Sequence, residues 1–209
     1  VPTLIQDGHT VTVLDNFLYE QNSLGHVCSS RKFDLIRGDA RDERLIDEYV
    51  KSADVVIPLA ALVGAPLCNK DPMGARTLNR DAVKMLVKKL ARDQQVIMTI
   101  TNYGYGIGTS GKYCTENSPL NPITLYAQTK VDAEKFVLSH QSGISLRLAT
   151  VFGMSPRMRV DLLVNDFVYR AVKDRAVVLF ESQFNLNYIH VRVVTRAFQL
   201  AFFNFYVMQ

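Results

Sequence analysis

The run Gln95-Val-Ile-Met-Thr-Ile-Thr101 decides the fold prediction, because its interior is almost entirely apolar or β-branched. Such a run predicts a strand that is buried on both faces. Patterns with helical spacing lie before it, over residues 72–92, and after it, over residues 126–139. A buried strand between two helices is typical of a β-α-β unit, in which helices cover parallel strands on both sides.

The same alternation extends over the rest of the chain. Further strands are predicted at residues 10–14, 33–37, 54–61, 145–151 and 177–180, and further helices at residues 42–51, 160–173 and 192–203, with the end of another helix at residues 1–6. The predicted fold class is therefore α/β, with a Rossmann-like, doubly wound parallel sheet. Ligands of this fold bind at the carboxyl ends of the strands, so we expect the chemistry at the residues that follow each strand.

Composition favours a globular enzyme over several other classes. The chain has 209 residues, of which 48% are hydrophobic and 21% charged, unlike a disordered or collagen-like chain. Its three cysteines are too few and too scattered for a disulfide framework or a zinc site, so we expect no metal and a reducing, cytoplasmic location. The chain shows no membrane-spanning run, no signal peptide and no basic stripe interleaved with aromatic residues. Neither a membrane nor a nucleic acid is therefore an expected partner.

Two aspartates stand directly after predicted strands. Asp15 follows the strand at residues 10–14, where a carboxylate can accept hydrogen bonds from the ribose hydroxyls of a dinucleotide and repel a 2′-phosphate, which favours NAD over NADP. Asp39 follows the strand at residues 33–37 and could receive the adenine amino group. Aspartates are common in turns after strands, so a purely structural role is the alternative for both.

Tyr126 and Lys130 form a Y-x-x-x-K pattern on a predicted helix, where residues four apart share a face. An ammonium beside a phenol favours the phenolate and is expected to lower the tyrosine pKa toward the range of a general base. The pattern alone is not specific, because it occurs again at Tyr169 and Lys173 within an apolar helical stretch that indicates packing. The position of Tyr126 after the strand that ends at Thr101 favours the first occurrence.

Together, eight segments resemble the extended short-chain dehydrogenase/reductase superfamily, in the NAD-dependent nucleotide-sugar epimerase/dehydratase branch typified by UDP-glucose 4-epimerase. Their order and spacing run through nearly the whole chain, which makes the set far more specific than any one member. The segments are DGHTVTVLDNF (7–17), GDARD (38–42), DVVIPLAALVG (54–64), LNRDAV (78–83), TNYGYG (101–106), ENSPLNPITLYAQTK (116–130), LRLATVFG (146–153) and NYIHVR (187–192).

The resemblance implies NAD as the cofactor, a nucleotide-diphosphate sugar as the substrate, and a role for each matching residue. It assigns catalysis to Thr101, Tyr126 and Lys130, with Tyr126 as the base. It assigns substrate binding to Thr101, Asn102, Tyr126 and Thr150. It assigns cofactor binding to Asp15 and Asn16 (adenosine ribose), Asp39 and Ala40 (adenine), Leu59, Ala60, Ala61 and Asn79 (the groove and its support), and Tyr126 and Lys130 (nicotinamide ribose).

The activity implied by the resemblance is C4 epimerisation through a keto sugar. The family's 4,6-dehydratases carry an Asp-Glu pair where this chain has Asn102-Tyr103, so dehydration is disfavoured, although dehydratase and 4-ketoreductase activities remain alternatives. A non-catalytic dinucleotide sensor is an alternative of another class. Val193 stands where the family has an aspartate, and His190 is expected to be structural.

Other side chains could also serve the site. Arg147, Arg157 and Arg159 could pair with a diphosphate or remain solvated. Cys68 and Cys114 are expected in loops near the cleft, most simply as bystanders.

The resemblance also predicts the domain organisation. Residues 1–153 are expected to form the NAD-binding domain without the first strand and glycine-rich loop of the family, and roughly 20 further residues are expected upstream. The strands at residues 10–14 and 54–61 then have no common neighbour. Residues 154–209 are expected to be part of the substrate-binding region. Strands and helices after residue 175 could also belong to the first domain. A homodimer is implied, in which the helix after Asn79 and the Tyr126 helix pair with their copies.

Overall fold

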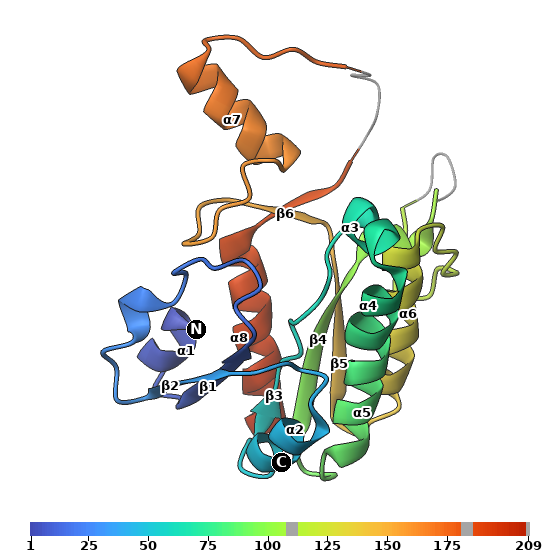
Figure 1. The fold of residues 1–209 in the computed structure, drawn as a ribbon. Helices are drawn as coiled ribbons and strands as arrows, with labels where there is room; N and C mark the ends of the chain where they lie inside the picture. The colour runs from blue at the N-terminus through green and yellow to red at the C-terminus, as the bar shows by residue number, and fades with distance from the viewer. Residues whose placement is uncertain (108–112, 181–185, 208–209) are drawn as a thin grey trace.

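The structure, a computed structural model, describes residues 1–107, 113–180 and 186–207, with side chains described up to residue 203 (Figure 1). Its strands are β1 (Val11–Asp15), β2 (Phe33–Arg37), β3 (Val55–Val56), β4 (Gln95–Thr101), β5 (Gly143–Leu148), β6 (Thr150–Phe152) and β7 (Tyr188–His190). Its α-helices are α1 (Pro2–Gln6), α2 (Glu43–Val50), α3 (Ala65–Lys70), α4 (Pro72–Arg76), α5 (Ala82–Lys89), α6 (Leu125–Leu138), α7 (Leu163–Lys173) and α8 (Val191–Val207).

Every strand pair in the described chain is parallel, and the strands form the groups β1-β2, β3-β4-β5 and β6-β7. Parallel strands alternating with helices confirm the predicted α/β, Rossmann-like class. β1 and β3 belong to different groups, so within the described residues no strand joins them. The ends of β1, β3 and β4 still lead toward one region, where the predicted site residues follow.

Helices cover β4 on both faces (Figure 1). Val96, Met98 and Ile100 pack against α5 and α6, whereas Ile97 points to the other face and meets Ala201 and Phe202 of α8, which are both buried. Burying a large apolar side chain contributes about 1.5–3 kcal/mol, so β4 is a major source of stability. The segment after residue 153 thus supplies a layer that covers one face of β4.

The strand predicted at residues 54–61 is mostly not a strand. β3 pairs with β4 only at Val55 and Val56, and the chain then leaves the sheet in an extended path. Pro58 has no N–H to donate, and Leu59 is 59% exposed. The residues after β3 are therefore available to line a groove rather than to extend the sheet.

The predicted helix at residues 72–92 is interrupted rather than regular. It is built from α4, a π turn over Thr77–Asp81 (η2) and α5, which ends at Lys89. The helix α3 before it was not predicted, because its six residues are too few to show a helical period. π turns of this kind are often found at functional sites.

The carboxyl-terminal third differs most from the prediction. The expected strand at residues 145–151 breaks at Ala149 into β5 and β6, and the expected strand at residues 177–180 is wrong. Leu179 and Phe180 are exposed, whereas β7, which was not predicted, pairs with β6. The pairing partner, rather than β propensity, decided which segment became a strand.

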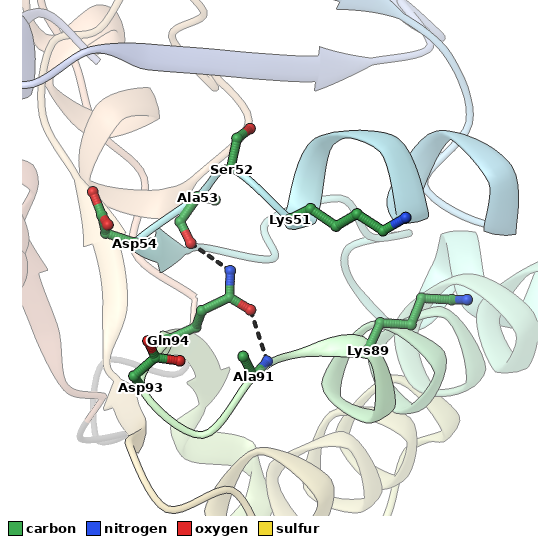
Figure 2. Close-up of a pocket in the computed structure, with 8 residues that line it drawn as sticks. All are labelled: Lys51, Ser52, Ala53, Asp54, Lys89, Ala91, Asp93 and Gln94. Atoms are coloured by element: carbon green, nitrogen blue, oxygen red, sulfur yellow. Dashed lines mark hydrogen bonds between the residues drawn. The ribbon is translucent and has the colours of Figure 1, made fainter.

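A cavity of about 320 Å³ lies at the amino ends of β3 and β4 (Figure 2). It is shaped by Gln94, whose Nε2 donates to the carbonyls of Val50 (2.7 Å) and Ala53 (2.5 Å), while its Oε1 accepts from Ala91 N at 2.8 Å. These bonds join the loop before β3 to the loop before β4. The cavity is at the opposite end of the sheet from the predicted site residues.

Among the helices that the structure describes, none is both long and apolar enough to cross a membrane.

Candidate active site

Thr101 is the last residue of β4 and is buried. Its Oγ1 accepts a hydrogen bond from Tyr103 N at 3.2 Å and thereby caps the 3₁₀ turn Asn102–Tyr105 (η3). The hydroxyl is thus held at the carboxyl end of the sheet with its proton free to be donated. Asn102, the other predicted substrate contact here, begins the turn that Thr101 caps.

Tyr126 and Lys130 lie in the first half of α6, which packs against β4 and η3. The helix begins at Leu125 because Thr124 Oγ1 accepts from Ala127 N at 3.2 Å. Tyr126 packs against a cluster that contains Leu62 and Cys68. Lys130 is only 5% exposed, and no described carboxylate pairs with its ammonium. The helix therefore presents a phenol and an unpaired buried cation on one face.

Burial controls the pKa values of both groups. It raises the pKa of Tyr126 to about 12 and lowers the pKa of Lys130 to about 8. The expectation that Lys130 lowers the pKa of Tyr126 is wrong for this structure, because burial raises that pKa and Lys130 is not among the groups that shift it. Burial and the Cys68 thiol both raise the pKa of Tyr126, and the positive charge of Arg159 lowers it.

Arg159 belongs to the loop that follows β6, and Asn165 holds this loop. Asn165 is buried; its Oδ1 accepts from Gly153 N at 3.0 Å, and its Nδ2 donates to the Arg159 carbonyl at 2.9 Å. Arg159 also donates from Nε to Asp161 Oδ1 at 2.8 Å. In the same loop, the Arg157 guanidinium lies 3.7 Å from the centre of the Tyr19 ring. The loop after β6 therefore reaches both Tyr126 and the loop after β1.

Asp15 and Asn16 begin an exposed turn after β1. Asp15 Oδ1 accepts from Phe17 N at 2.7 Å, and Asn16 Oδ1 accepts from Leu18 N at 3.1 Å. Asp15 therefore has the structural role that was weighed as its alternative, and Asn16 makes a similar turn contact. One oxygen of the exposed Asp15 carboxylate makes no hydrogen bond to a described residue, so a ribose contact remains open to it.

Asp39 and Ala40 follow β2, as predicted, but the Asp39 carboxylate is already engaged. Arg41 Nε donates to its Oδ1 at 2.9 Å, and Arg41 N donates to the same oxygen at 2.8 Å. The hydrogen bonds from Arg41 lower the pKa of Asp39. A contact with adenine would therefore have to share this carboxylate with Arg41.

Asn79 supports the residues after β3. Its side chain is 1% exposed; Oδ1 accepts from Leu62 N at 2.8 Å and Nδ2 donates to the Leu62 carbonyl at 2.9 Å. Ala60 is exposed and Ala61 partly so, directly before this clamp. Asn79 lies in the π turn, which places its amide toward Leu62. The small side chains of Ala60 and Ala61 thus lie beside a backbone segment that Asn79 holds in place.

Replacing Asn79 by alanine is expected to lower the free energy of unfolding by about 1–3 kcal/mol, because the buried N–H of Leu62 loses its partner and the Leu62 C=O keeps only the weak Cys68 thiol donor. Urea unfolding measures the change. The matched control is Asn69→Ala on the exposed side of α3, for which about 0.5 kcal/mol or less is expected. Equal unfolding midpoints for the two variants would contradict the proposed clamp.

Thr150 begins β6 and pairs with Tyr188 of β7. His190 ends β7 and has packing contacts: its ring meets Phe152 edge-on at 5.3 Å between centroids, and its Nδ1 accepts from Arg192 N at 3.2 Å. These contacts agree with the structural role expected for His190. Val193 is half exposed on α8.

Two expectations about other side chains are corrected. Arg147 is neither solvated nor free for a diphosphate, because it is paired with Glu134, which is 3% exposed. Cys68 lies in helix α3 rather than in a loop, and its buried thiol donates to the Leu62 carbonyl at 3.2 Å. Burial raises the pKa of this thiol, which opposes a nucleophilic role.

Sequence reasoning missed Glu134, Asn165 and the proximity of Arg159 to Tyr126. Glu134 had a usable signal, because it follows Tyr126 by eight residues and Lys130 by four and so shares their helix face. The partners of Asn165 are backbone groups 6 and 12 residues earlier in the loop after β6, and no sequence motif marks contacts of that kind.

The described residues fit a dinucleotide at the carboxyl ends of the strands. Asp15 offers a free carboxylate oxygen, Ala60 and Ala61 leave space beside a clamped backbone, and Lys130 offers an unpaired ammonium. Small residues allow a cofactor to approach the backbone, and an ammonium can donate to ribose hydroxyls.

Comparison with known proteins places the chain in a family. A model of the NAD dependent epimerase/dehydratase family matches residues 1–205. The low-salt glycan biosynthesis protein Agl12 of Haloferax volcanii is 27% identical over 192 residues, which cover 85% of this chain and 59% of that protein. UDP-glucuronic acid decarboxylase 1 of Xenopus tropicalis is 26% identical over 192 residues, which cover 86% of this chain and 44% of that protein. The chain thus spans about half the length of these relatives.

Solved structures share the fold. The structure of the dTDP-glucose 4,6-dehydratase DesIV of Streptomyces venezuelae, with NAD and TYD bound, matches with a TM-score of 0.80 at 22% identity. The match covers 96% of this chain and 67% of the DesIV chain. UDP-glucuronic acid 4-epimerase of Bacillus cereus, in complex with UDP-glucuronic acid and NAD, has a TM-score of 0.74 at 20% identity, over 91% of this chain and 64% of its own. The fold and the family model agree, and the chain belongs to the NAD-dependent epimerase/dehydratase family.

Proposed function

We propose that the protein is an NAD-dependent nucleotide-sugar epimerase that inverts C4 of the sugar. The observation that carries this proposal is the position of partly buried Tyr126 and buried Lys130 on α6, which packs against β4, the strand that ends at Thr101. A phenol, a hydroxyl and an ammonium beside a cofactor groove suit proton removal from a sugar hydroxyl.

Tyr126 acts as the base that takes the proton of the C4 hydroxyl, and Thr101 positions that hydroxyl by hydrogen bonding. NAD, when bound, supplies the acceptor and later the donor of the hydride. The sugar becomes a 4-keto sugar, turns over in the site and is reduced on its other face, while Tyr126 returns the proton to the oxygen. Proton and hydride are both returned, so the net reaction is an isomerisation.

Ionisation of Tyr126 needs positive charge, because burial raises its pKa to about 12. Arg159 is the cation that lowers this pKa in the structure. Lys130 is the residue proposed to bond the nicotinamide ribose, and Asp15, Asn16, Asp39, Ala40, Leu59, Ala60, Ala61 and Asn79 are proposed to form the rest of the cofactor groove. Asn102 and Thr150 are proposed to contact the sugar.

Elimination of water is the nearest alternative, since similar proteins include dTDP-glucose 4,6-dehydratase. Elimination needs an acid and a base beyond the tyrosine. The residues after Thr101 are Asn102 and Tyr103, and neither is a carboxylic acid. This side-chain chemistry favours epimerisation over dehydration.

Product analysis tests the proposal. The natural protein, with any residues that flank these 209 retained, is incubated with NAD and a set of UDP-, dTDP- and GDP-sugars, and the products are identified by NMR. Interconversion of C4 epimers is expected. A keto-deoxy or decarboxylated product would establish a different reaction in the same site, and NAD binding without turnover of any sugar would indicate a sensor.

We further propose that the protein is a homodimer formed through α5 and α6. The two helices pack side by side, and an open groove of about 320 Å³ lies between their outer faces, lined by Arg80, Asp81, Lys84, Asp132, Lys135 and Phe136. Sedimentation equilibrium is expected to give twice the chain mass. A monomer at micromolar concentration would be incompatible with this arrangement.

A further inference from the structure

Glu134 and Arg147 form a buried ion pair that the reaction proposed above does not use. Arg147 Nε donates to Glu134 Oε1 at 2.9 Å and Nη2 donates to Oε2 at 3.1 Å, so the guanidinium binds both carboxylate oxygens. The Ser145 hydroxyl donates to Oε1 at 2.6 Å. The Glu134 side chain is 3% exposed and that of Arg147 is 18% exposed. The carboxylate is thus satisfied by protein groups rather than by water.

The same guanidinium also reaches the segments on either side of the site. Arg147 Nη1 donates to the Tyr105 hydroxyl at 3.0 Å and to the Glu116 carbonyl at 2.9 Å. Tyr105 lies in η3, directly after Thr101, and Glu116 lies in the segment that leads to α6. Arg147 therefore joins β5, η3 and α6 at one point, which fixes the position from which it holds Glu134.

Glu134 is adjacent to Lys130 on the inner face of α6. Residues four apart on a helix are neighbours, and both side chains are buried. A carboxylate and an ammonium so placed attract strongly where water is excluded. Nevertheless, among the described residues the partner of Glu134 is Arg147 and not Lys130. The bidentate geometry of the guanidinium gives it the advantage over a single ammonium.

We propose that Arg147 is a positioning residue that occupies Glu134 and so keeps Lys130 free for the cofactor ribose and Tyr126. The proposal rests on the role given to Lys130 in the proposed function. Without Arg147, Glu134 captures the ammonium of Lys130 and draws it away from the site. Two cations, Lys130 on α6 and Arg147 on β5, thus compete for the one carboxylate of Glu134.

Three variants test this inference: R147M, E134Q and the double variant E134Q/R147M. R147M is expected to weaken NAD binding and to lower kcat/KM by about tenfold or more, because the released Glu134 pairs with Lys130. The double variant is expected to recover both quantities to within about threefold of the wild type, because no carboxylate remains to capture Lys130. Recovery on removing a second side chain is not expected if Arg147 only supports the fold.

The double variant also keeps the test valid if R147M fails to fold, because both members of the Glu134–Arg147 ion pair are neutral in it and neither leaves the other as an unpaired buried charge. A double variant with native circular dichroism that remains about tenfold or more below the wild type would overturn the inference. K89M is the matched control: Lys89 is similarly buried and paired with Glu43 and Asp47, but at the opposite end of the sheet, so unchanged NAD affinity is expected.

The readouts separate this inference from the proposed function. NAD affinity is measured by calorimetry without any sugar, so it reports on cofactor binding, including the proposed Lys130 contact, independently of the sugar reaction. If the wild type binds NAD but converts no nucleotide sugar, the proposed reaction fails, while the NAD affinities of the three variants still support or overturn the competition between Arg147 and Lys130 for Glu134.

Discussion

Replacing Tyr126 by phenylalanine is expected to lower kcat for nucleotide-sugar turnover by about 10²- to 10⁴-fold, the usual contribution of a general acid–base group. Phenylalanine keeps the ring that packs near Leu62 and Cys68 and removes only the hydroxyl. No described residue forms a hydrogen bond with that hydroxyl, so its loss leaves no unpaired partner and stability is expected to change by about 1 kcal/mol or less. Steady-state kinetics and thermal unfolding measure the two effects.

The second Y-x-x-x-K pattern in the chain provides the control for this experiment. Tyr169 lies on α7, 47% exposed, with the Lys173 ammonium 5.2 Å from the centre of its ring. Tyr169→Phe is expected to leave kcat unchanged. If Tyr126→Phe kept kcat within about threefold of the wild type, general base catalysis by Tyr126 would be excluded.

Replacing Lys130 by methionine is expected to have opposite effects on activity and on stability. Activity is expected to fall by about 10²-fold or more, because the site loses the cation near Tyr126 and the cofactor ribose. Without cofactor, however, the free energy of unfolding at neutral pH is expected to rise by about 1–3 kcal/mol, because an unpaired buried ammonium is removed. Urea unfolding of both proteins without NAD measures this gain.

The stability gain is expected to depend on pH in a defined direction. Burial lowers the pKa of Lys130 from 10.5 to about 8 in the folded state. The folded protein therefore binds fewer protons than the unfolded chain between these values, so wild-type stability rises with pH there. The advantage of Lys130→Met is full below about pH 8 and is expected to shrink by more than half near pH 9.5.

A surface lysine of the same helix serves as the control. Lys135 is exposed and pairs with Asp132 at 2.9 Å, and Lys135→Met is expected to change stability by about 0.5 kcal/mol or less at either pH. Lower stability of Lys130→Met than of the wild type at neutral pH would show that the ammonium has a stabilising partner, contrary to the burial argument. Measurements stay below about pH 10 because Tyr126, with its raised pKa, would contribute above that value.

Elements buried on both faces were the most predictable from sequence. β4 carries a nearly unbroken apolar run because α5 and α6 cover one face and α8 the other. The limits of α6 were predicted to within one residue because Thr124 caps it. By contrast, β7 is three residues long and exists because it pairs with β6, and a strand of that length has no readable period.

Some residues of the candidate site could likewise be predicted from the sequence, whereas the contacts between them could not. Thr101, Tyr126 and Asp15 could be singled out because each stands at a strand end or on a recognisable helix segment, whereas Asn79 was indicated only by the family resemblance. The clamp of Asn79 on Leu62 spans 17 residues, and the pair between Glu134 and Arg147 joins a helix to a strand. Contacts of this kind leave no local pattern, since they depend on how the elements pack.

The sequence by itself determined the alternation of strands and helices, the parallel sheet and the residues that follow its strands, because periodicity and turn residues act over a few neighbouring positions. Only the tertiary structure decided the charge state of the site. Burial by distant segments raises the pKa of Tyr126 and lowers that of Lys130, and packing brings Arg159 near the phenol and commits Glu134 to Arg147. Desolvation and ion pairing depend on neighbours in space, which the order of residues along the chain does not state.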